Sequence, residues 1–544
     1  MLIGALKLTH DSACAVMEDE RLLFSVEFEK LNNNKRHGKL KKSSEILEIL
    51  KMNGISFDDI STWIIDGWWQ NEKNIYFEGE KVIVNNYHNE LYKIPENTVY
   101  YGTNSIFGKY KSYSHVYSHL CASYCTSPFA MKNESSYVLV FDGGTKPVLY
   151  FYNSEEKKFE YLGVVLKFGG DIYASLASRF EPYKNMRSIV DGKEKLNIYF
   201  AGKVMAYIAM GKANKEIYDF CVSQYSKLSD DNGRLNNWKE NRKFEFALVK
   251  EFENKYNSAD ILYNFHMLIQ NELITSLRSL IKQNPKSSDK ICLSGGSMLN
   301  IKWNTAIRNC GLFSEVYAPP FVNDTGAAIG NLCADLMANG KTYLDWNTYL
   351  GPALTPGQID LSWAQKKCSI NELANIIANS GEPVVVLNGR AELGPRALGN
   401  RSIIADARDA KMKDKLNCIK NRESYRPVAP ICIEEDAPLF FEPGLPDKYM
   451  LFEHSRGERA DEIPAVFHLD NTARLQTITK EDNPIIYELL LCYKKITGVS
   501  VLCNTSANYL GKGFFPDVRS AQDWGMCKYI WSEGILYEKT SNCH

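Results

Sequence analysis

Two histidines four residues apart are the first residues in this sequence that could bind a metal ion. His115 and His119 lie in a stretch expected to be helical, and residues four apart share one face of a helix. Asp142, before a Gly-Gly turn, and Asp324, at the start of an expected helix, are candidate carboxylate ligands. Two imidazoles and a carboxylate suit Fe(II) or Zn. The alternatives are solvated or capping histidines, with Asp142 as a turn former and Asp324 as an N-cap.

Three loops with paired glycines each follow an apolar, strand-like run. Consecutive glycines let backbone N–H groups approach a phosphate or an adenosine closely, although a single pair is more often a plain turn. Together with an opening β-meander, three such loops resemble the actin/sugar-kinase/Hsp70 ATPase architecture. The loops are Phe141-Asp-Gly-Gly144, Phe168-Gly-Gly-Asp171 and Ser294-Gly-Gly-Ser297.

A basic segment follows in the last third of the chain. Residues 390–426 contain ten Lys/Arg against five acidic residues, a net charge of +5 in a chain whose total is −1. Fixed guanidinium groups suit bidentate binding of phosphates. We interpret Arg396 and Arg426, which lie beside prolines and apolar residues, as ligands of such a group. The expected helix at 411–422 is better explained as a solvated charged face.

The elements that must position these residues can be read from hydrophobic periodicity. Turn-forming residues cluster at Gly351-Pro352 and Thr355-Pro356-Gly357, which predicts the main domain boundary near 350–370. A turn is expected at 230–233. Strands are predicted at 2–8, 13–17, 22–28, 137–141, 148–152, 290–293, 316–318, 384–387, 402–405, 428–433 and 499–502. Helices are predicted at 46–52 (with Ser43-Ser44 as the cap), 114–126, 202–210, 268–281, from about 299, and at 325–338, 411–419 and 485–494.

Composition narrows the class of protein. A 544-residue chain with 44% hydrophobic and 24% charged residues has the ordinary globular mix. Its near-neutral charge argues against a general nucleic-acid or membrane-surface binder. The apolar runs are of strand length, and the N-terminus lacks the pattern of a signal peptide. Fourteen scattered cysteines without a CxxC pair favour a reduced, cytoplasmic protein.

Nearly the whole sequence resembles the carbamoyltransferases of antibiotic tailoring and nodulation-factor biosynthesis. The block at 388–402 is highly specific when it is combined with the RPVAP and NTS motifs, whereas HxxxH and GG are not. The matching motifs are His10-Asp-Ser-Ala13, His115-x3-His119-x3-Ser123, Ser127-Pro-Phe129, Phe141-Asp-Gly-Gly144, Gly202-Lys-Val-Met205, Gly295-Gly-Ser-Met-Leu-Asn300, Asn323-Asp-Thr-Gly326, the block 388–402, Tyr425-Arg-Pro-Val-Ala-Pro430 and Asn504-Thr-Ser-Ala-Asn508.

The resemblance implies an α/β protein with two domains and a two-site reaction. Residues 1–355 would form an actin/sugar-kinase/Hsp70-like ATPase-fold domain, similar to the threonylcarbamoyl-transfer proteins of tRNA modification. Residues 370–544 would form a YrdC-like α+β domain, which joins carbamoyl phosphate and ATP, with Mg²⁺, into carbamoyl-adenylate. The N-terminal domain would then transfer the carbamoyl group to a hydroxyl of a small natural-product acceptor, and AMP would leave.

The same resemblance implies roles for individual residues. His10 would lie at the reacting centre; it falls in a polar break between two predicted strands, where a satisfied turn histidine is the alternative. The metal, Fe²⁺ or alternatively Zn²⁺, would be held by His115, His119, Asp142 and Asp324. The N-terminal domain would bind the adenylate through Lys35, Gly143, Gly144, Gly295, Gly296 and Asn300. The C-terminal domain would bind carbamoyl phosphate and ATP through Arg396, Lys420, Arg426, Arg474, Asn504, Ser506 and Asn508.

Three segments depart from the family pattern. Val26-Glu-Phe-Glu29 replaces the usual Glu-Glu-Arg-Phe, Lys35-Arg-His37 replaces a Lys-His pair, and Ala206-Tyr-Ile-Ala-Met210 replaces a run of small residues. These departures leave the acceptor, the general base and the role of Lys35 open.

Three functions therefore remain in view. The first is an O-carbamoyltransferase for a small hydroxylated metabolite, with no nucleic-acid or membrane partner and with a homodimer as one option. The second is a tRNA threonylcarbamoyl transferase, which the arginine-rich second domain and the lack of basic excess disfavour. The third is a non-catalytic nucleotide-binding scaffold, which the combination of His10, metal ligands and phosphate-binding arginines disfavours.

Overall fold

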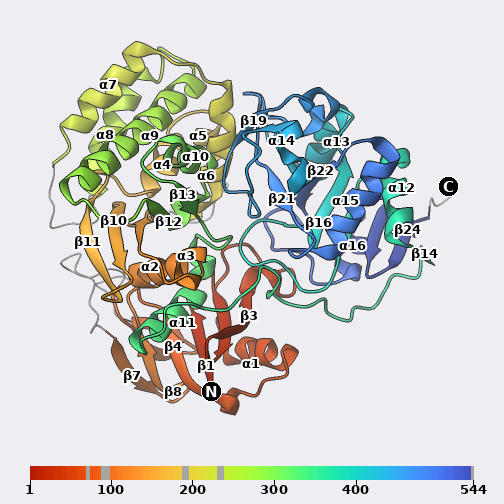
Figure 1. The fold of residues 1–544 in the computed structure, drawn as a ribbon, viewed down its shortest axis with the longest axis horizontal. Helices are drawn as coiled ribbons and strands as arrows, with labels where there is room; N and C mark the ends of the chain where they lie inside the picture. The colour runs from red at the N-terminus through yellow and green to blue at the C-terminus, as the bar shows by residue number, and fades with distance from the viewer. Residues whose placement is uncertain (69–73, 87–98, 187–194, 230–237, 541–544) are drawn as a thin grey trace.

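The structure of this chain is a computed structural model that describes residues 1–68, 74–86, 99–186, 195–229 and 238–540. Figure 1 shows two groups of sheets: one built from the first part of the chain, in red to green, and one from the last part, in teal to blue. The expected α/β class is confirmed. The turn predicted at 230–233 lies outside the described residues. None of the described helices is both long enough and apolar enough to cross a membrane.

The first sheet has six strands in the order β3-β2-β1-β4-β8-β7. Its first three strands form the predicted antiparallel meander, and β4 continues the sheet parallel to β1, as β8 does parallel to β4. Helix α1 (Ser43–Met52) connects β3 to β4. The strands are β1 (Leu2–Lys7), β2 (Ala13–Glu18), β3 (Arg21–Glu27), β4 (Ile60–Ile65), β7 (Tyr100–Asn104) and β8 (Gly108–Ser112), with a separate hairpin of β5 (Asn74–Phe77) and β6 (Glu80–Ile83).

The second sheet repeats this plan in the order β11-β10-β9-β12-β13. Again an antiparallel meander of three strands is followed by two strands parallel to its first member. This recurrence agrees with the expected actin/sugar-kinase/Hsp70-like fold. The strands are β9 (Ser136–Val140), β10 (Val148–Asn153), β11 (Lys158–Val164), β12 (Lys290–Ser294) and β13 (Glu315–Tyr317).

Two helices pack against each other between these sheets. Helix α11 (Ala327–Ala338) contacts β1, β2 and β4 of the first sheet, while α2 (His115–Cys125) contacts β9 and β12 of the second. Both helices are buried along almost their whole length, because small and apolar side chains such as Ala328, Leu332 and Cys121 fill the layer between the sheets. The first turn of α2 is therefore fixed from both sides.

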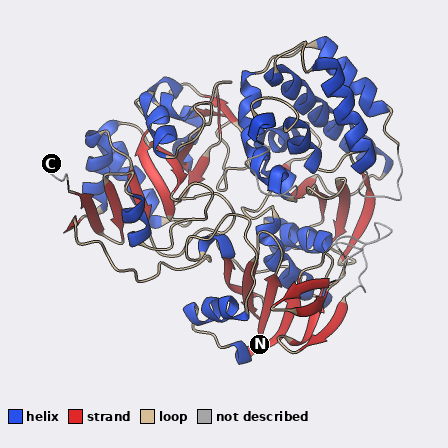
Figure 2. Cartoon of the chain, turned by 180° about the vertical axis from the view of Figure 1, so that it is seen from behind, coloured by secondary structure: helices blue, strands red, loops and turns tan. Residues whose placement is uncertain are grey.

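A helical layer covers the outer face of the second sheet (Figures 1 and 2). Its apolar faces share one core with β9, β10 and β12. The layer comprises α4 (Asp171–Ala177), α5 (Tyr183–Met186), α6 (Lys195–Tyr207), α7 (Lys215–Ser226), α8 (Trp238–Phe252), α9 (Ser258–Gln283) and α10 (Ile301–Asn309). The short helix α3 (Pro128–Met131) instead follows α2 and packs in the core between the two sheets.

The last part of the chain forms an eight-stranded mixed sheet in the order β14-β24-β23-β15-β16-β22-β17-β21. Its strands are β14 (Trp363–Lys367), β15 (Val384–Leu387), β16 (Arg401–Asp406), β17 (Ala429–Ile433), β21 (Gln476–Ile478), β22 (Val501–Ser506), β23 (Tyr529–Ser532) and β24 (Ile535–Lys539). A small sheet of β18 (Phe441–Glu442), β19 (His454–Arg456) and β20 (Thr472–Ala473) lies apart from it. The helices are α12 (Ile370–Ser380), α13 (Lys411–Ile419), α14 (Ala437–Phe440), α15 (Pro484–Thr497) and α16 (Val518–Trp524).

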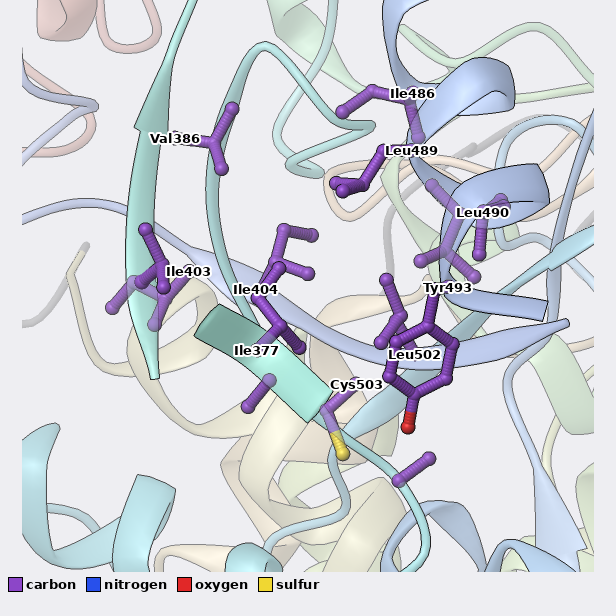
Figure 3. Packing of buried hydrophobic residues seen from close by; sticks show 14 of the residues in the cluster. Ile377, Val386, Ile403, Ile404, Ile486, Leu489, Leu490, Tyr493, Leu502 and Cys503 are labelled. Carbon is purple, nitrogen blue, oxygen red and sulfur yellow. The ribbon is translucent and has the colours of Figure 1, made fainter. Parts of the chain in front are cut away.

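Helix α15 shows why this core forms. Pro484 occupies its first turn, the side chain of Asn483 caps it, and Gly498 ends it in the left-handed conformation. The apolar side chains of α15 recur at helical spacing and face the strands, as Figure 3 shows for Ile486, Leu489, Leu490 and Tyr493 against Ile403, Ile404 and Leu502.

Most predicted elements are present, with differences at their ends. Helix α1 begins at Ser43 with Lys42 as its N-cap residue, so Ser43-Ser44 lies inside the first turn rather than capping it. Helix α9 begins at Ser258 rather than at 268, because the Asn257 side chain accepts a hydrogen bond from the Asp260 backbone. The chain passes between the two groups of sheets through 339–362, and the division into two domains near there stays a prediction.

Candidate active site

Four predicted metal ligands converge between the two N-terminal sheets. His115 and His119 lie one turn apart on α2, Asp142 follows β9, and Asp324 opens the short turn before α11. One ligand atom of each residue lies within 4.8 Å of the others, and all four residues are buried. The four-residue spacing, the strand end and the turn before α11 therefore bring these side chains to one point.

The distances within this cluster suit a shared ion. The Oδ1 atom of Asp324 lies 3.4 Å from Nε2 of both His115 and His119. Oδ2 of Asp142 lies 3.9 Å from Nε2 of His115. The Nε2 atom of His119 is buried and makes no hydrogen bond to the described residues, which is costly unless a ligand occupies it. A nitrogen and oxygen set without thiolate fits a divalent metal such as Fe²⁺ or Zn²⁺.

A carboxylate that the sequence analysis missed orients the first histidine. Oδ2 of Asp66 lies 2.7 Å from Nδ1 of His115, and Oδ1 of Asp66 accepts hydrogen bonds from Ser118 and Asn331 at 3.0 and 2.9 Å. Such a pair turns the opposite ring nitrogen toward a metal. Although burial opposes it, the Asp66 charge raises the pKa of His115 to about 10. Asp66 follows the apolar strand β4 as Asp142 follows β9, which was the available signal.

Asp324 also connects the cluster to His10. Its Oδ2 atom lies 3.0 Å from Nε2 of His10 and 3.0 Å from Nζ of Lys7. The turn that Asp324 opens has Asn323 as its N-cap residue and no side-chain cap, so the N-cap explanation of Asp324 is wrong. Lys7 is a further residue of this site that the sequence analysis missed; the available signal was a single charged residue in an apolar strand.

We expect this cluster to retain a metal ion during purification. Elemental analysis should find about one divalent ion per chain, and the double change His115→Ala with His119→Ala should remove it, because both nitrogen ligands are lost. The change His266→Ala, in a buried histidine of α9, should leave the metal content unaltered. A stoichiometric metal retained by the folded double variant would contradict this assignment.

The three glycine loops meet around Asp142. The backbone N–H groups of Gly170 and Asp171 donate to the carbonyls of Asp142 and Gly143, at 3.1 and 3.0 Å. Gly296 donates its N–H to Oδ1 of Asp142 at 3.0 Å. Gly295 has a φ of 94°, and a Cβ there would lie 2.4 Å from the Phe141 carbonyl. Backbone, rather than side chains, therefore lines this end of the cluster.

The remaining residues predicted to bind adenylate in the N-terminal part differ in their surroundings. Gly144 lies in the same loop as Gly143. The Asn300 side chain caps α10, accepting hydrogen bonds from the backbone of Lys302 and Trp303 at 3.2 and 3.4 Å. Lys35 is exposed, and its backbone pairs with Lys512.

Three predicted arginines gather in the C-terminal part. Burial, together with the charges of Arg474, Arg36 and Arg426, holds the pKa of Arg396 well below its usual range. Burial and Arg426 lower the pKa of Arg474 to about 10. The Nε atoms of Arg396 and Arg474 are buried without a hydrogen-bond partner among the described residues. Guanidinium groups that repel one another and whose N–H donors lack acceptors are typical of a site that binds an anion.

Among the other predicted C-terminal residues, Lys420, Ser506 and Asn508 form a hydrogen-bonded group. Lys420 donates to the carbonyls of Ser506 and Asn508 and to Oδ1 of Asn508, at 2.9, 2.6 and 2.7 Å. Burial, then Arg422 and Arg36, lower the pKa of Lys420 to about 7. The Oδ1 atom of Asn504 is buried without a partner in the described part of the chain. Lys420 thus fixes the loop that carries Ser506 and Asn508.

The specific block at 388–402 is folded around two buried charges. Oε1 of Glu392 accepts backbone hydrogen bonds from Leu398, Asn400 and Arg401 at 2.6, 3.0 and 3.2 Å. The Arg401 guanidinium donates to the Asn388 carbonyl at 2.8 Å, among other backbone carbonyls. These contacts position the loop that presents Arg396.

One N-terminal segment lies between the two clusters. The backbone N–H of Arg36 donates to the Gly511 carbonyl at 3.0 Å, and Gly513 donates to the Asn34 carbonyl at 3.1 Å. The charge of Arg36 acts on both Arg396 and Lys420. The next residue, His37, places Nδ1 2.6 Å from Oδ1 of Asp11, which adjoins His10. Arg36, which the sequence analysis did not select, therefore lies close to Arg396 and Lys420, although it is more than 350 residues away from them in the sequence.

Comparison with known sequences identifies the class of protein that carries these two clusters. Residues 2–333 match the carbamoyltransferase N-terminus, and residues 374–530 match the carbamoyltransferase C-terminus. The chain belongs to the carbamoyltransferase family. It is similar to Nodulation protein U of Sinorhizobium fredii, with 39% identity over 99% of this chain and 100% of that protein. It is also 31% identical to 3'-hydroxymethylcephem-O-carbamoyltransferase of Amycolatopsis lactamdurans, over 94% of each chain.

Two solved structures show a distant resemblance to this chain. The crystal structure of T. kodakarensis HypF has a TM-score of 0.34 and 15% identity, covering 63% of this chain and 48% of that one. The activator of the 2-hydroxyisocaproyl-CoA dehydratase from Clostridium difficile, with bound ADPNP, has a TM-score of 0.33 and 12% identity, covering 62% and 96%. At this level of similarity neither structure carries an argument about the site.

Proposed function

We propose that this carbamoyltransferase is an ATP-dependent O-carbamoyltransferase with two reaction sites. The basic cluster within 370–544 forms carbamoyl-adenylate from carbamoyl phosphate and ATP with Mg²⁺. The cluster around His10 within 1–355 transfers the carbamoyl group to a hydroxyl of a small natural-product acceptor. The observation that carries the proposal is the group of half-buried arginines near Asn504, in which the buried Nε atoms of Arg396 and Arg474 have no hydrogen-bond partner among the described residues, in a member of this family.

The first reaction needs charge neutralisation more than covalent chemistry. A carbamate oxygen attacks the α-phosphorus of ATP, and pyrophosphate leaves. Atom balance requires one water, because carbamoyl phosphate must give up its own phosphate before that oxygen can form the new bond. Phosphoryl and adenylyl transfers depend chiefly on positioning and on cations around the phosphates. Arg396, Arg426 and Arg474 supply such cations in a half-buried setting, where charges act more strongly than in water.

The second reaction transfers the carbamoyl group from the phosphate of the adenylate to the hydroxyl oxygen of the acceptor. The acceptor hydroxyl attacks the carbamoyl carbon and gives up its proton to His10 as the acid–base group, the bond from that carbon to the AMP oxygen breaks, and AMP leaves with the electron pair. Fe²⁺ or Zn²⁺ held by His115, His119, Asp142 and Asp324 would supply positive charge beside the anionic adenylate. The glycine loops place backbone without side chains beside Asp142, which lets a phosphate or an adenosine approach closely. His10 is 31% exposed and held by Asp324, so a substrate can reach it at the edge of this cluster.

Incubation without an acceptor tests the proposal. With ATP, Mg²⁺ and carbamoyl phosphate, we expect phosphate and pyrophosphate in equal amounts and carbamoyl-AMP detectable by mass spectrometry. Omitting carbamoyl phosphate should abolish pyrophosphate release. A metal-loaded protein that binds ATP yet releases no pyrophosphate would contradict the adenylate route and favour a scaffold.

A further inference from the structure

A buried lysine is built into the metal-binding cluster. Lys7 lies on β1 with its side chain fully buried, and its Nζ atom lies 3.0 Å from Oδ2 of Asp324 and 3.4 Å from Oδ2 of Asp66. It also donates to Oγ1 of Thr9 at 3.0 Å and lies over the Trp68 ring. The ammonium is therefore held inside the protein between two carboxylates.

The two carboxylate oxygens of Asp324 have different neighbours, and Lys7 contacts only one of them. Oδ2 is occupied by Lys7 and by His10, each at 3.0 Å. Oδ1 is turned toward the two histidines of α2, at 3.4 Å from each Nε2. Asp324 is thereby set to offer a metal one oxygen rather than two. Lys7 acts on the same carboxylate that a metal would use, so its charge must affect the ion bound there.

The charges in contact within this cluster can be counted. Asp66, Asp142 and Asp324 contribute three negative charges, and Lys7 offsets one, which leaves −2 while the histidines are neutral. The next carboxylate outward, Asp11, is held by His37 at 2.6 Å. A net charge inside a protein is costly. A divalent ion brings this count to zero, whereas a trivalent ion leaves one uncompensated positive charge.

We propose that Lys7 is a specificity-determining residue that makes this site prefer a divalent over a trivalent ion. The inference rests on the metal site of the proposed function, but it concerns binding alone and is tested without substrates. Removing the ammonium leaves three negative charges, which a trivalent ion balances. The ion preference should therefore follow the charge at position 7 rather than the shape of its side chain.

The test compares the affinities of the metal-free protein for Zn²⁺ and for Ga³⁺, a trivalent ion that undergoes no redox change, by competition with a chelator. In Lys7→Gln and Lys7→Met, the affinity for Ga³⁺ relative to Zn²⁺ should rise at least about tenfold, because one unit of short-range repulsion is removed. Lys7→Arg, which keeps the charge, should retain the original preference. Lys111→Met removes a different lysine, one paired with Asp335 at 2.6 Å, and should change nothing.

Two neutral variants are used so that the test remains decisive if one of them folds poorly. Glutamine in Lys7→Gln can still donate a hydrogen bond to Asp324, whereas methionine in Lys7→Met cannot. Circular dichroism confirms folding before each titration. An unchanged Ga³⁺/Zn²⁺ ratio in a folded neutral variant would overturn the inference, as would an equal shift in Lys7→Arg. Failure of carbamoyl-adenylate formation, in contrast, would leave this binding result unaffected.

Discussion

Replacing Arg426 with alanine is expected to slow pyrophosphate release from ATP and carbamoyl phosphate by a few hundredfold. Arg426 faces Arg396 and Arg474, whose Nε atoms have no partner among the described residues. Losing one guanidinium from such a cluster removes charge stabilisation of about 3–4 kcal/mol in the transition state. The initial rate of pyrophosphate formation without an acceptor measures this effect directly.

A matched arginine separates this effect from general damage to the C-terminal part. Arg408 lies just after β16 and forms an ion pair with Asp406 at 2.7 Å, in the same part of the chain but outside the arginine cluster. Arg408→Ala should keep pyrophosphate release close to that of the unchanged protein. Equal losses in both variants would point to instability instead of a phosphate site.

Replacing His10 with alanine should have the opposite pattern. Pyrophosphate release and carbamoyl-AMP formation should persist, while carbamoylation of an acceptor should fall by about 10²–10⁴-fold, the range for loss of a positioned acid–base group. His10 contacts Asp324 of the metal cluster, and none of its described contacts is to the arginine cluster. Chromatography of the acceptor and its carbamoylated product, with a hydroxylated acceptor chosen with the unchanged protein, gives the transfer rate.

Retained adenylate formation in the His10 variant serves as its own folding control. If His10→Ala stops pyrophosphate release in a folded protein, the two reactions cannot be assigned to separate clusters. The short path from His10 through Asp11 and His37 to Arg36 makes this outcome a serious test, because that segment contacts both parts of the chain.

The sequence predicted local features well where chemistry and backbone geometry coincide. A four-residue histidine spacing requires only a helix to form a metal-binding face, and glycine pairs after apolar strands require only tight turns. The meanders followed from alternating apolar runs and polar turns. Helix starts were less accurate, because a capping side chain such as Asn257 decides them and several polar residues could have served.

The residues that the sequence analysis missed depend on contacts between distant segments. Asp66 reaches His115 only because β4 lies next to β1 and under α11, and a single aspartate after a strand has no distinctive spacing. A lysine in an apolar strand is ordinarily unfavourable, so Lys7 makes sense only once Asp324 lies beside it. Arg36 required the docking of 34–36 on 511–513, which no local pattern reveals.

The most direct test of the two-site account is the rate of carbamoyl transfer when carbamoyl-AMP is supplied to Arg426→Ala. The account predicts that this variant, unable to make the adenylate at an appreciable rate, transfers the carbamoyl group from added carbamoyl-AMP to the acceptor nearly as fast as the unchanged protein. Loss of that transfer in a folded, metal-loaded Arg426→Ala protein would contradict the account and require a single shared site.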